Sequence, residues 1–122
     1  MTFLTSLSPH VHWGMRASVA ATYLYHGSHK FPPTALVENL GFPLWFAWII
    51  AVTEILAAVC LLAGPFTKDV VTRAGSLLVV TNMIGAITIV HNSAWDYRAG
   101  GMEFQLLILA VATYFLVKGN DA

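Results

Sequence analysis

Charged residues are scarce in this sequence. Aspartate, glutamate, lysine and arginine make up 10% of its 122 residues, whereas hydrophobic residues make up 57%. A soluble domain carries roughly 25% charged residues, and a chain this short has a large surface to cover. The deficit indicates that most of the surface faces lipid. The formal net charge is zero, so the chain has no excess of basic residues and no nucleic-acid partner is expected.

Cysteine is almost absent, with Cys60 as the single example. One cysteine cannot form an intrachain disulfide, a CxxC redox pair or a cysteine zinc site. This excludes the small four-helix thiol oxidoreductases, which need paired cysteines. The sequence also lacks a Ser–His–Asp pattern, a phosphate-binding glycine loop and a dinucleotide fingerprint, so no catalytic residue is assigned. No lysine or arginine precedes Arg16, so we expect a retained first helix and no cleaved signal peptide.

Four apolar segments predict transmembrane helices at residues 11–30, 43–64, 73–92 and 102–118. A helix needs about 20 residues to cross a hydrocarbon core of roughly 30 Å. The connections between the segments are short and contain the helix-breaking residues proline and glycine. We therefore expect an all-α, antiparallel up-down-up-down four-helix transmembrane bundle, with residues 1–122 forming one domain.

The positive charges give a prediction of orientation. With four spans, both termini share a side of the membrane with the second loop, and this side carries Lys68, Arg73 and Lys118. The opposite side carries Lys30 and Arg98. The positive-inside rule then places both termini in the cytoplasm, with the lipid bilayer as the principal partner.

Three polar residues lie inside the predicted spans. Glu54 is near the middle of the second span, on a stripe of small alanines that favours the bundle interior. Arg16, in the first span, is the candidate partner for Glu54, although its long side chain could also extend to the nearer interface. Asn82, in the third span, predicts an interhelical hydrogen bond. Because a central charge in a bilayer costs about 2.5–3.5 kcal/mol, we expect a polar network of structural or functional importance.

A second polar group follows from the topology. The end of the first helix, the end of the third and the start of the fourth share one side of the bundle. This side gathers His26, His29, Lys30, His91 and Glu103 as candidate ligand-binding residues. They could represent ordinary interfacial polarity, a site for a polar ligand or quinone head group, or a metal site. The histidine spacing completes no specific metal motif, so no metal ligand is assigned.

The order and spacing of four elements resemble one known family. These elements are Arg16, the stretch from Tyr23 to Phe31, the run from Glu54 to Thr67, and the last segment from Gly100 to Gly119. With this pattern, the chain resembles the DoxX family of small bacterial and archaeal membrane proteins over nearly its whole length. The resemblance implies a four-helix protein of the cytoplasmic membrane.

The resemblance also carries functional expectations. Arg16, Glu54 and Glu103 occupy the family's recurrent polar positions. Some relatives are associated with thiosulfate oxidation coupled to quinone reduction, and others with membrane oxidoreductase or stress-response assemblies. The chain departs from the pattern at residues 57–58, where alanines replace the usual glycines, and at residues 120–122, where the charged end is reduced.

Three functions are consistent with these observations. The first is a membrane-anchor or accessory subunit of a quinone-linked redox assembly, with quinone as its candidate cofactor and a membrane protein as its partner. The second is a small permease or ion pathway, which would need a homo-oligomer because four helices enclose little room. The third is a purely structural subunit of a larger membrane complex. Catalysis by the chain alone is not expected under any of them.

Overall fold

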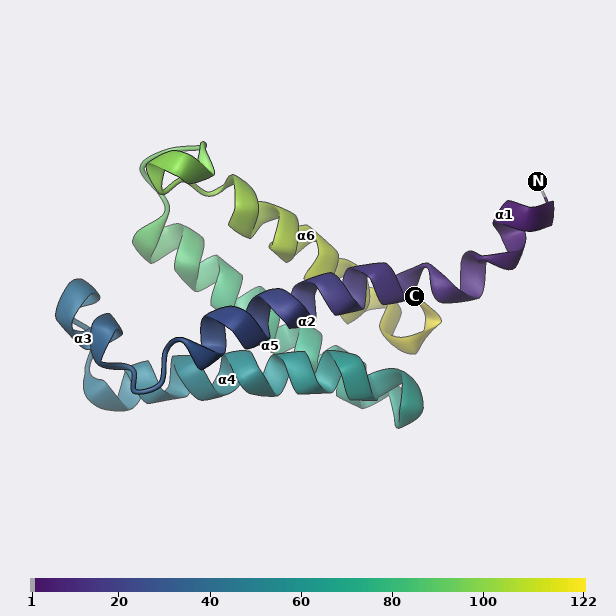
Figure 1. Ribbon diagram of the computed structural model, residues 1–122, viewed down its shortest axis with the longest axis horizontal. Coiled ribbons are helices and arrows are strands. Elements are labelled where there is room, and N and C mark those ends of the chain that lie inside the picture. Colours follow the sequence, from purple (N-terminus) through teal and green to yellow (C-terminus); the bar gives the residue numbers. More distant parts are fainter. Residues whose placement is uncertain (1) are drawn as a thin grey trace.

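The computed structural model describes residues 2–122 and contains helices but no strand among these residues, which confirms the all-α prediction. Four long helices of 16 to 20 residues make up most of the structure, and short helical segments connect them (Figure 1). The α-helices are α1 (Thr2–Ser6), α2 (His12–Ser28), α3 (Thr34–Leu40), α4 (Leu44–Ala63), α5 (Asp69–Gly85) and α6 (Glu103–Lys118). The turns are 3₁₀ segments at Ser8–His10, Gly64–Phe66, Tyr97–Ala99 and Gly119–Asp121, and a π-helical segment at Ala86–Val90 that continues α5.

The sequence indicates only a break after Pro32, whereas the structure has the short helix α3 in this region. Pro33 caps its N-terminus, and Gly41 ends it in the left-handed conformation with φ 71°. Glycine adopts this conformation without the strain that a Cβ atom causes. The same two breaks that were expected therefore enclose a seven-residue helix.

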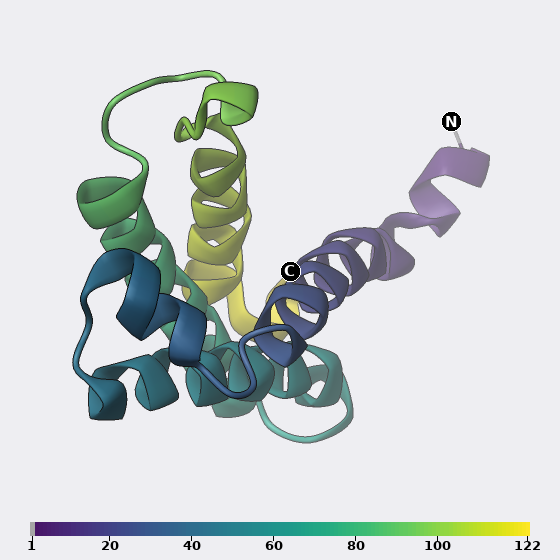
Figure 2. The same cartoon turned by 60° about the vertical axis from the view of Figure 1, so that its left-hand side comes forward.

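Consecutive long helices run in opposite directions, and each packs on the next: α2 on α4, α4 on α5, and α5 on α6. Figures 1 and 2 show that the helices converge near the C-terminus and diverge toward α3 and the loop that follows α5. The arrangement is thus a succession of packed pairs that is open at one end. The four-helix transmembrane bundle expected from the sequence stays a prediction beyond these packed pairs.

Small residues make the helix contacts, and large apolar residues face outward. On α4, Ala51 and Ala58 are fully buried, whereas Val52 and Val59 are about half exposed, at 49% and 51%. A Cβ atom on Gly75 of α5 would lie 2.6 Å from the Cβ atom of Cys60, so α4 and α5 pack in close contact there. Small interior residues and large apolar exterior residues are typical of helices that associate in lipid.

Two of the long helices are long and apolar enough to cross a membrane. They are Leu44–Phe66, with mean hydropathy 2.4, and Asp69–Val90, with mean hydropathy 1.6. The other two, α2 and α6, have 17 and 16 residues. At 1.5 Å per residue they are about 26 and 24 Å long, which is slightly less than a hydrocarbon core of roughly 30 Å.

Candidate functional site

Glu54 is the buried carboxylate at the centre of α4, and its partner is Lys30. The Lys30 Nζ lies 3.0 Å from Glu54 Oε2 and also donates to the carbonyl oxygen of His26. Glu54 is 8% exposed. Gly27 lets α2 approach α4 closely beside Glu54, because a Cβ atom on Gly27 would lie 3.2 Å from the Glu54 Cβ atom.

The expectation that Arg16 would pair with Glu54 is wrong, for a geometric reason. Since α2 and α4 are antiparallel, the start of α2 lies beside the end of α4 and the end of α2 lies beside its middle. Arg16 accordingly reaches Leu61, and the glycine beside Glu54 is Gly27. Arg16 and Glu54 belong to two separate polar clusters.

A cavity of about 770 Å³ occupies the open end of the structure. Apolar side chains from α3, α4, α5 and α6 form most of its wall, including Leu36, Phe46, Ile50, Leu77 and Ile108. The polar side chains in the wall include His26, Lys30, Glu54, Asn82, His91 and Gln105. Pockets of this size, mainly apolar with a few polar groups, are typical of small-molecule sites.

The cavity brings together residues from both polar groups that the sequence analysis singled out. Glu54 and Asn82 come from the intramembrane set, and His26, Lys30 and His91 come from the ligand-binding set. Asn82 lies on the α5 side and its Nδ2 donates to Thr53 Oγ1 of α4 at 3.5 Å.

Two of the predicted ligand-binding residues do not line this cavity. The exposed His29 has its Nδ1 atom 2.7 Å from the carbonyl oxygen of Tyr25 on its own helix. The carboxylate of Glu103 accepts a hydrogen bond from the backbone N–H of Tyr97 at 2.9 Å, and so it holds the loop before α6.

Gln105 was not singled out from the sequence, yet it carries an unusual feature of the cavity. Its Oε1 atom is buried and has no hydrogen-bond partner among residues 2–122. A buried acceptor without a donor is rare in proteins and marks a place where a donor is missing. A single glutamine near the start of an apolar helix gives no signal of this in the sequence.

The loop between α5 and α6 is held by Asp96, whose carboxylate accepts hydrogen bonds from the Arg98 side chain and from its backbone N–H, each at 2.9 Å. Both hydrogen bonds hold the pKa of Asp96 below its usual value. The bond from the Arg98 side chain has the larger effect, and the bond from the Arg98 backbone N–H has the smaller one. His91 joins the loop at its other end, with Nδ1 2.8 Å from the carbonyl oxygen of Gly100. These bonds order the loop beside the cavity.

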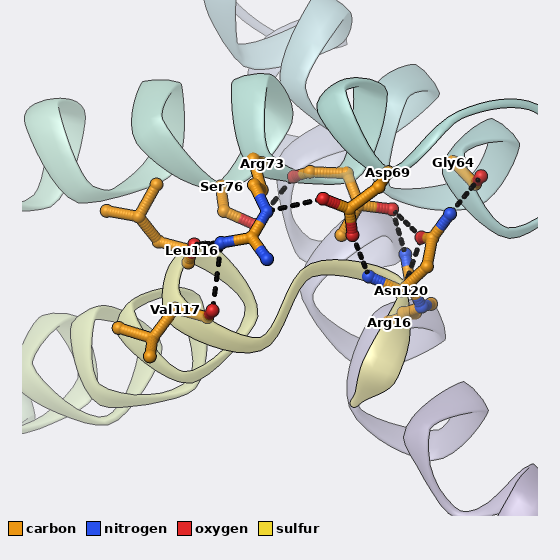
Figure 3. Close-up of polar contacts among 9 residues, drawn as sticks. Arg16, Gly64, Asp69, Arg73, Ser76, Leu116, Val117 and Asn120 are labelled. Carbon is orange, nitrogen blue, oxygen red and sulfur yellow. Dashed lines mark hydrogen bonds and ion pairs between the residues drawn. The ribbon is translucent and has the colours of Figure 1, made fainter.

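A second polar cluster lies at the closed end, around Arg16 (Figure 3). Arg16 is 1% exposed, and its guanidinium lies 4.6 Å from the ring centroid of Phe115. Nη1 donates to the carbonyl oxygen of Leu61 at 2.8 Å and to Thr72 Oγ1 at 3.0 Å. The Leu61 carbonyl needs this donor, because Pro65, four residues later, has no N–H.

The same cluster also binds the segment that follows α4 and the end of α6. Asn120 Nδ2 donates to the Gly64 carbonyl oxygen at 2.9 Å, and the Asn120 backbone N–H donates to Asp69 Oδ1. Arg73 donates to the carbonyl oxygens of Leu116 and Val117 at the end of α6. Donors near a helix C-terminus satisfy carbonyl groups that have no partner within the helix. This cluster therefore has a structural role, and none of its residues lines the cavity.

No group of three or more histidine, cysteine, aspartate or glutamate side chains able to hold a metal ion occurs in the described part of the chain. The polar side chains of the cavity wall are one ion pair, two histidines, two amides and the hydroxyl-bearing residues Thr22, Tyr23, Thr53 and Thr81.

Small residues in the helix contacts, large apolar residues outside and two spans of membrane length define a small helical membrane protein. Its family follows from a direct comparison: residues 15–114 match the model of the DoxX-like family, and the chain belongs to that family. This confirms the resemblance drawn from the sequence. Searches among curated proteins and among solved structures found no match.

Proposed function

We propose that this protein is a membrane subunit of a quinone-linked redox assembly and that its cavity binds the quinone. The observation that carries the proposal is an apolar cavity of about 770 Å³ with the Lys30–Glu54 ion pair in its wall. A quinone needs an apolar space for its ring and tail and a hydrogen-bond donor for its carbonyl oxygen. The Lys30 ammonium group is such a donor.

The membrane arrangement belongs to the same proposal. All four long helices cross the cytoplasmic membrane of a bacterium or archaeon, with both termini in the cytoplasm. Large apolar residues that face outward on α4 and α6 support this, since Val59 and Val117 are 51% and 67% exposed. In this arrangement the open end of the structure, with Lys30 and the loop after α5, lies at the membrane face away from the cytoplasm. A ligand can enter the cavity there from the lipid.

A partner protein completes the proposal. Electron transfer to or from a bound quinone needs a second redox group, and the single Cys60 cannot supply a dithiol pair within one chain. We assign that role to a membrane-associated redox protein that this chain anchors. The exposed apolar surface gives room for such a partner beside the lipid.

The test is purification of the tagged protein in a mild detergent, with mass spectrometry of co-purifying proteins and extraction of bound quinone. We expect about one quinone per chain and enrichment of a redox protein. Lys30→Met should reduce the bound quinone severalfold. The matched control, Lys68→Met, alters an exposed lysine outside the cavity and should leave the quinone content unchanged.

Two results contradict the proposal. Absence of quinone together with absence of a redox partner refutes it outright. Proteoliposomes that show solute or ion flux sensitive to Glu54→Gln, but not to the exposed control Glu38→Gln, would favour a permease.

A further inference from the structure

At the closed end, a contact between His12 and Arg16 sets a titratable ring against a permanent positive charge. The Arg16 Nε atom donates to His12 Nδ1 at 2.9 Å, one turn away on α2. Arg16 is 1% exposed. Its other two nitrogens donate to three more residues of the closed end, which are Leu61, Thr72 and Asn120. The guanidinium is thus held in place, and the His12 ring has to match it.

The chemistry of the two groups determines the protonation state of the ring. An arginine side chain is always charged and only donates hydrogen bonds. His12 Nδ1 accepts from it, so this nitrogen carries a lone pair and the ring proton is on Nε2. A proton on Nδ1 would turn the acceptor into a donor and set two positive charges side by side. The hydrogen bond therefore requires a neutral His12.

We propose that His12 and Arg16 form a pH-sensitive latch, which fixes the closed end while His12 is neutral and releases it when His12 takes up a proton. The proposal goes beyond the proposed function and does not depend on the ligand of the cavity. Protonation leaves Arg16 Nε without its acceptor. The stability of the fold then falls as the pH falls, because the unfolded chain binds a proton that the latched structure excludes.

The groups closest to the ring come from α2 and from the turn before it. Arg16 repels a charge on the ring, and His10 adds to this repulsion. The carbonyl oxygen of Pro9 is near enough to accept a hydrogen bond from a charged ring. The ring can therefore exchange one partner for another: Arg16 donates to the neutral ring, and the charged ring donates to Pro9.

No acidic side chain of the neighbouring elements compensates a charge on His12. Among residues 2–122, no carboxylate forms an ion pair with His12. Asp69 of α5 is bound by an arginine of its own helix and by the Asn120 backbone N–H. Asp121 is exposed, and the last turn of α6 adds a further cation, Lys118. The surroundings thus favour the neutral ring.

The latch affects more than one helix, because Arg16 joins α2 to the end of α4, to α5 and to the C-terminal turn. A hydrogen bond that involves a charged group contributes enough to change an equilibrium constant about tenfold. Histidine side chains change charge between about pH 5 and pH 8. We expect the unfolding equilibrium constant to rise about tenfold between pH 8 and pH 5 through this contact.

The experiment measures unfolding of the full-length protein in mixed detergent micelles at pH 8 and pH 5, with two substitutions of His12. In His12→Asn the side-chain carbonyl oxygen takes the place of Nδ1 and does not titrate. This variant should lack the tenfold change between the two pH values. His12→Phe keeps a ring beside Trp13 but has no acceptor. It should be about tenfold less stable than the unmodified protein at pH 8 and equally stable at pH 5.

The matched control is His10→Asn, which removes an exposed histidine two residues away and leaves the contact with Arg16 in place. It should keep the pH dependence of the unmodified protein. Equal pH dependence of His12→Asn and the unmodified protein would overturn the proposal, and so would loss of that dependence in His10→Asn.

A second measurement needs no variant, and it decides the question even where a substitution prevents folding. Nitrogen-15 NMR of the histidine rings in the unmodified protein reports which ring nitrogen of His12 carries the proton. We expect a proton on Nε2 and none on Nδ1 at pH 8, and protons on both at low pH. A proton on Nδ1 at pH 8 would overturn the proposal, because Arg16 could not then donate to that atom.

Discussion

Replacing Arg16 should expose how the closed end is held together. In Arg16→Met the Leu61 carbonyl loses the Nη1 donor at 2.8 Å, and no backbone donor replaces it because residue 65 is proline. Pro65→Ala supplies a backbone N–H at the position where a continuing helix would use it. We therefore expect Pro65→Ala to rescue part of the damage that Arg16→Met causes.

The magnitude follows from the hydrogen bonds. A buried acceptor that is left unpaired costs about 1–3 kcal/mol, and a typical net hydrogen bond contributes about 1 kcal/mol. We expect Arg16→Met to destabilise the protein by about 2–3 kcal/mol, since its hydrogen bonds to Leu61 and Thr72 are both lost. Pro65→Ala should recover about 1 kcal/mol in that background.

The assay is a double-mutant cycle on the free energy of unfolding in mixed detergent micelles. The cycle removes the effect that Pro65→Ala has alone, which includes added freedom of the unfolded chain. As a control, Pro43→Ala at the other end of α4 should combine additively with Arg16→Met. Additivity of Pro65→Ala with Arg16→Met would refute the argument that Arg16 replaces the missing N–H.

Three further predictions address other parts of the molecule. Lys30→Met should destabilise the protein more than Glu54→Gln does, because it leaves the less exposed Glu54 carboxylate unpaired. A double-mutant cycle on these two residues should give a coupling energy of about 1–3 kcal/mol, and a coupling near zero would contradict the ion pair. Gly75→Val should cost about 2 kcal/mol or more by forcing α4 and α5 apart, as measured by thermal unfolding, whereas Gly85→Val, where a Cβ atom meets nothing within 4 Å, should cost less. Because the pKa of Asp96 is lowered, the contribution of Asp96 to loop order is fully present above about pH 4 and is lost as the pH falls through the folded pKa. The amide resonance of Arg98 should report this change. The same titration of that resonance in Asp96→Asn would contradict the assignment to Asp96.

Much of the fold could be predicted because helix periodicity and breaker residues are local properties. The long apolar runs and the breaks at proline and glycine indicate the main helices without knowledge of their contacts. The start of α5 at Asp69, four residues before the expected 73, follows from an acidic residue in its first turn, a local signal that the apolar run alone does not include. The divergence of the helices could not be predicted, since it depends on which small residues meet across α4 and α5.

The candidate site shows where sequence reasoning is limited. Topology placed His26, Lys30 and His91 at one end, and all three line the cavity. The partner of Glu54 was misassigned because composition alone does not fix the level at which two antiparallel helices meet. Gln105 was missed because the absence of a partner is a property of the folded structure and leaves no pattern in the sequence.

The two polar clusters lie at opposite ends of the molecule and have different roles. At the closed end, Arg16 donates to the Leu61 carbonyl, which the break at Pro65 leaves without a backbone donor. Asn120 adds a second donor to the Gly64 carbonyl, so the helices are fixed there. At the other end, no comparable network joins α4 to α6 among residues 2–122, and the cavity occupies the space between them. Fixing one end while leaving the other open lets a small chain hold its helices together and still accommodate a ligand. The family match ends at residue 114, so Asn120, which completes the closed end, lies outside the matched region. A change at Asn120 should therefore affect stability alone, whereas changes at Lys30 or Glu54 should affect ligand binding as well as stability.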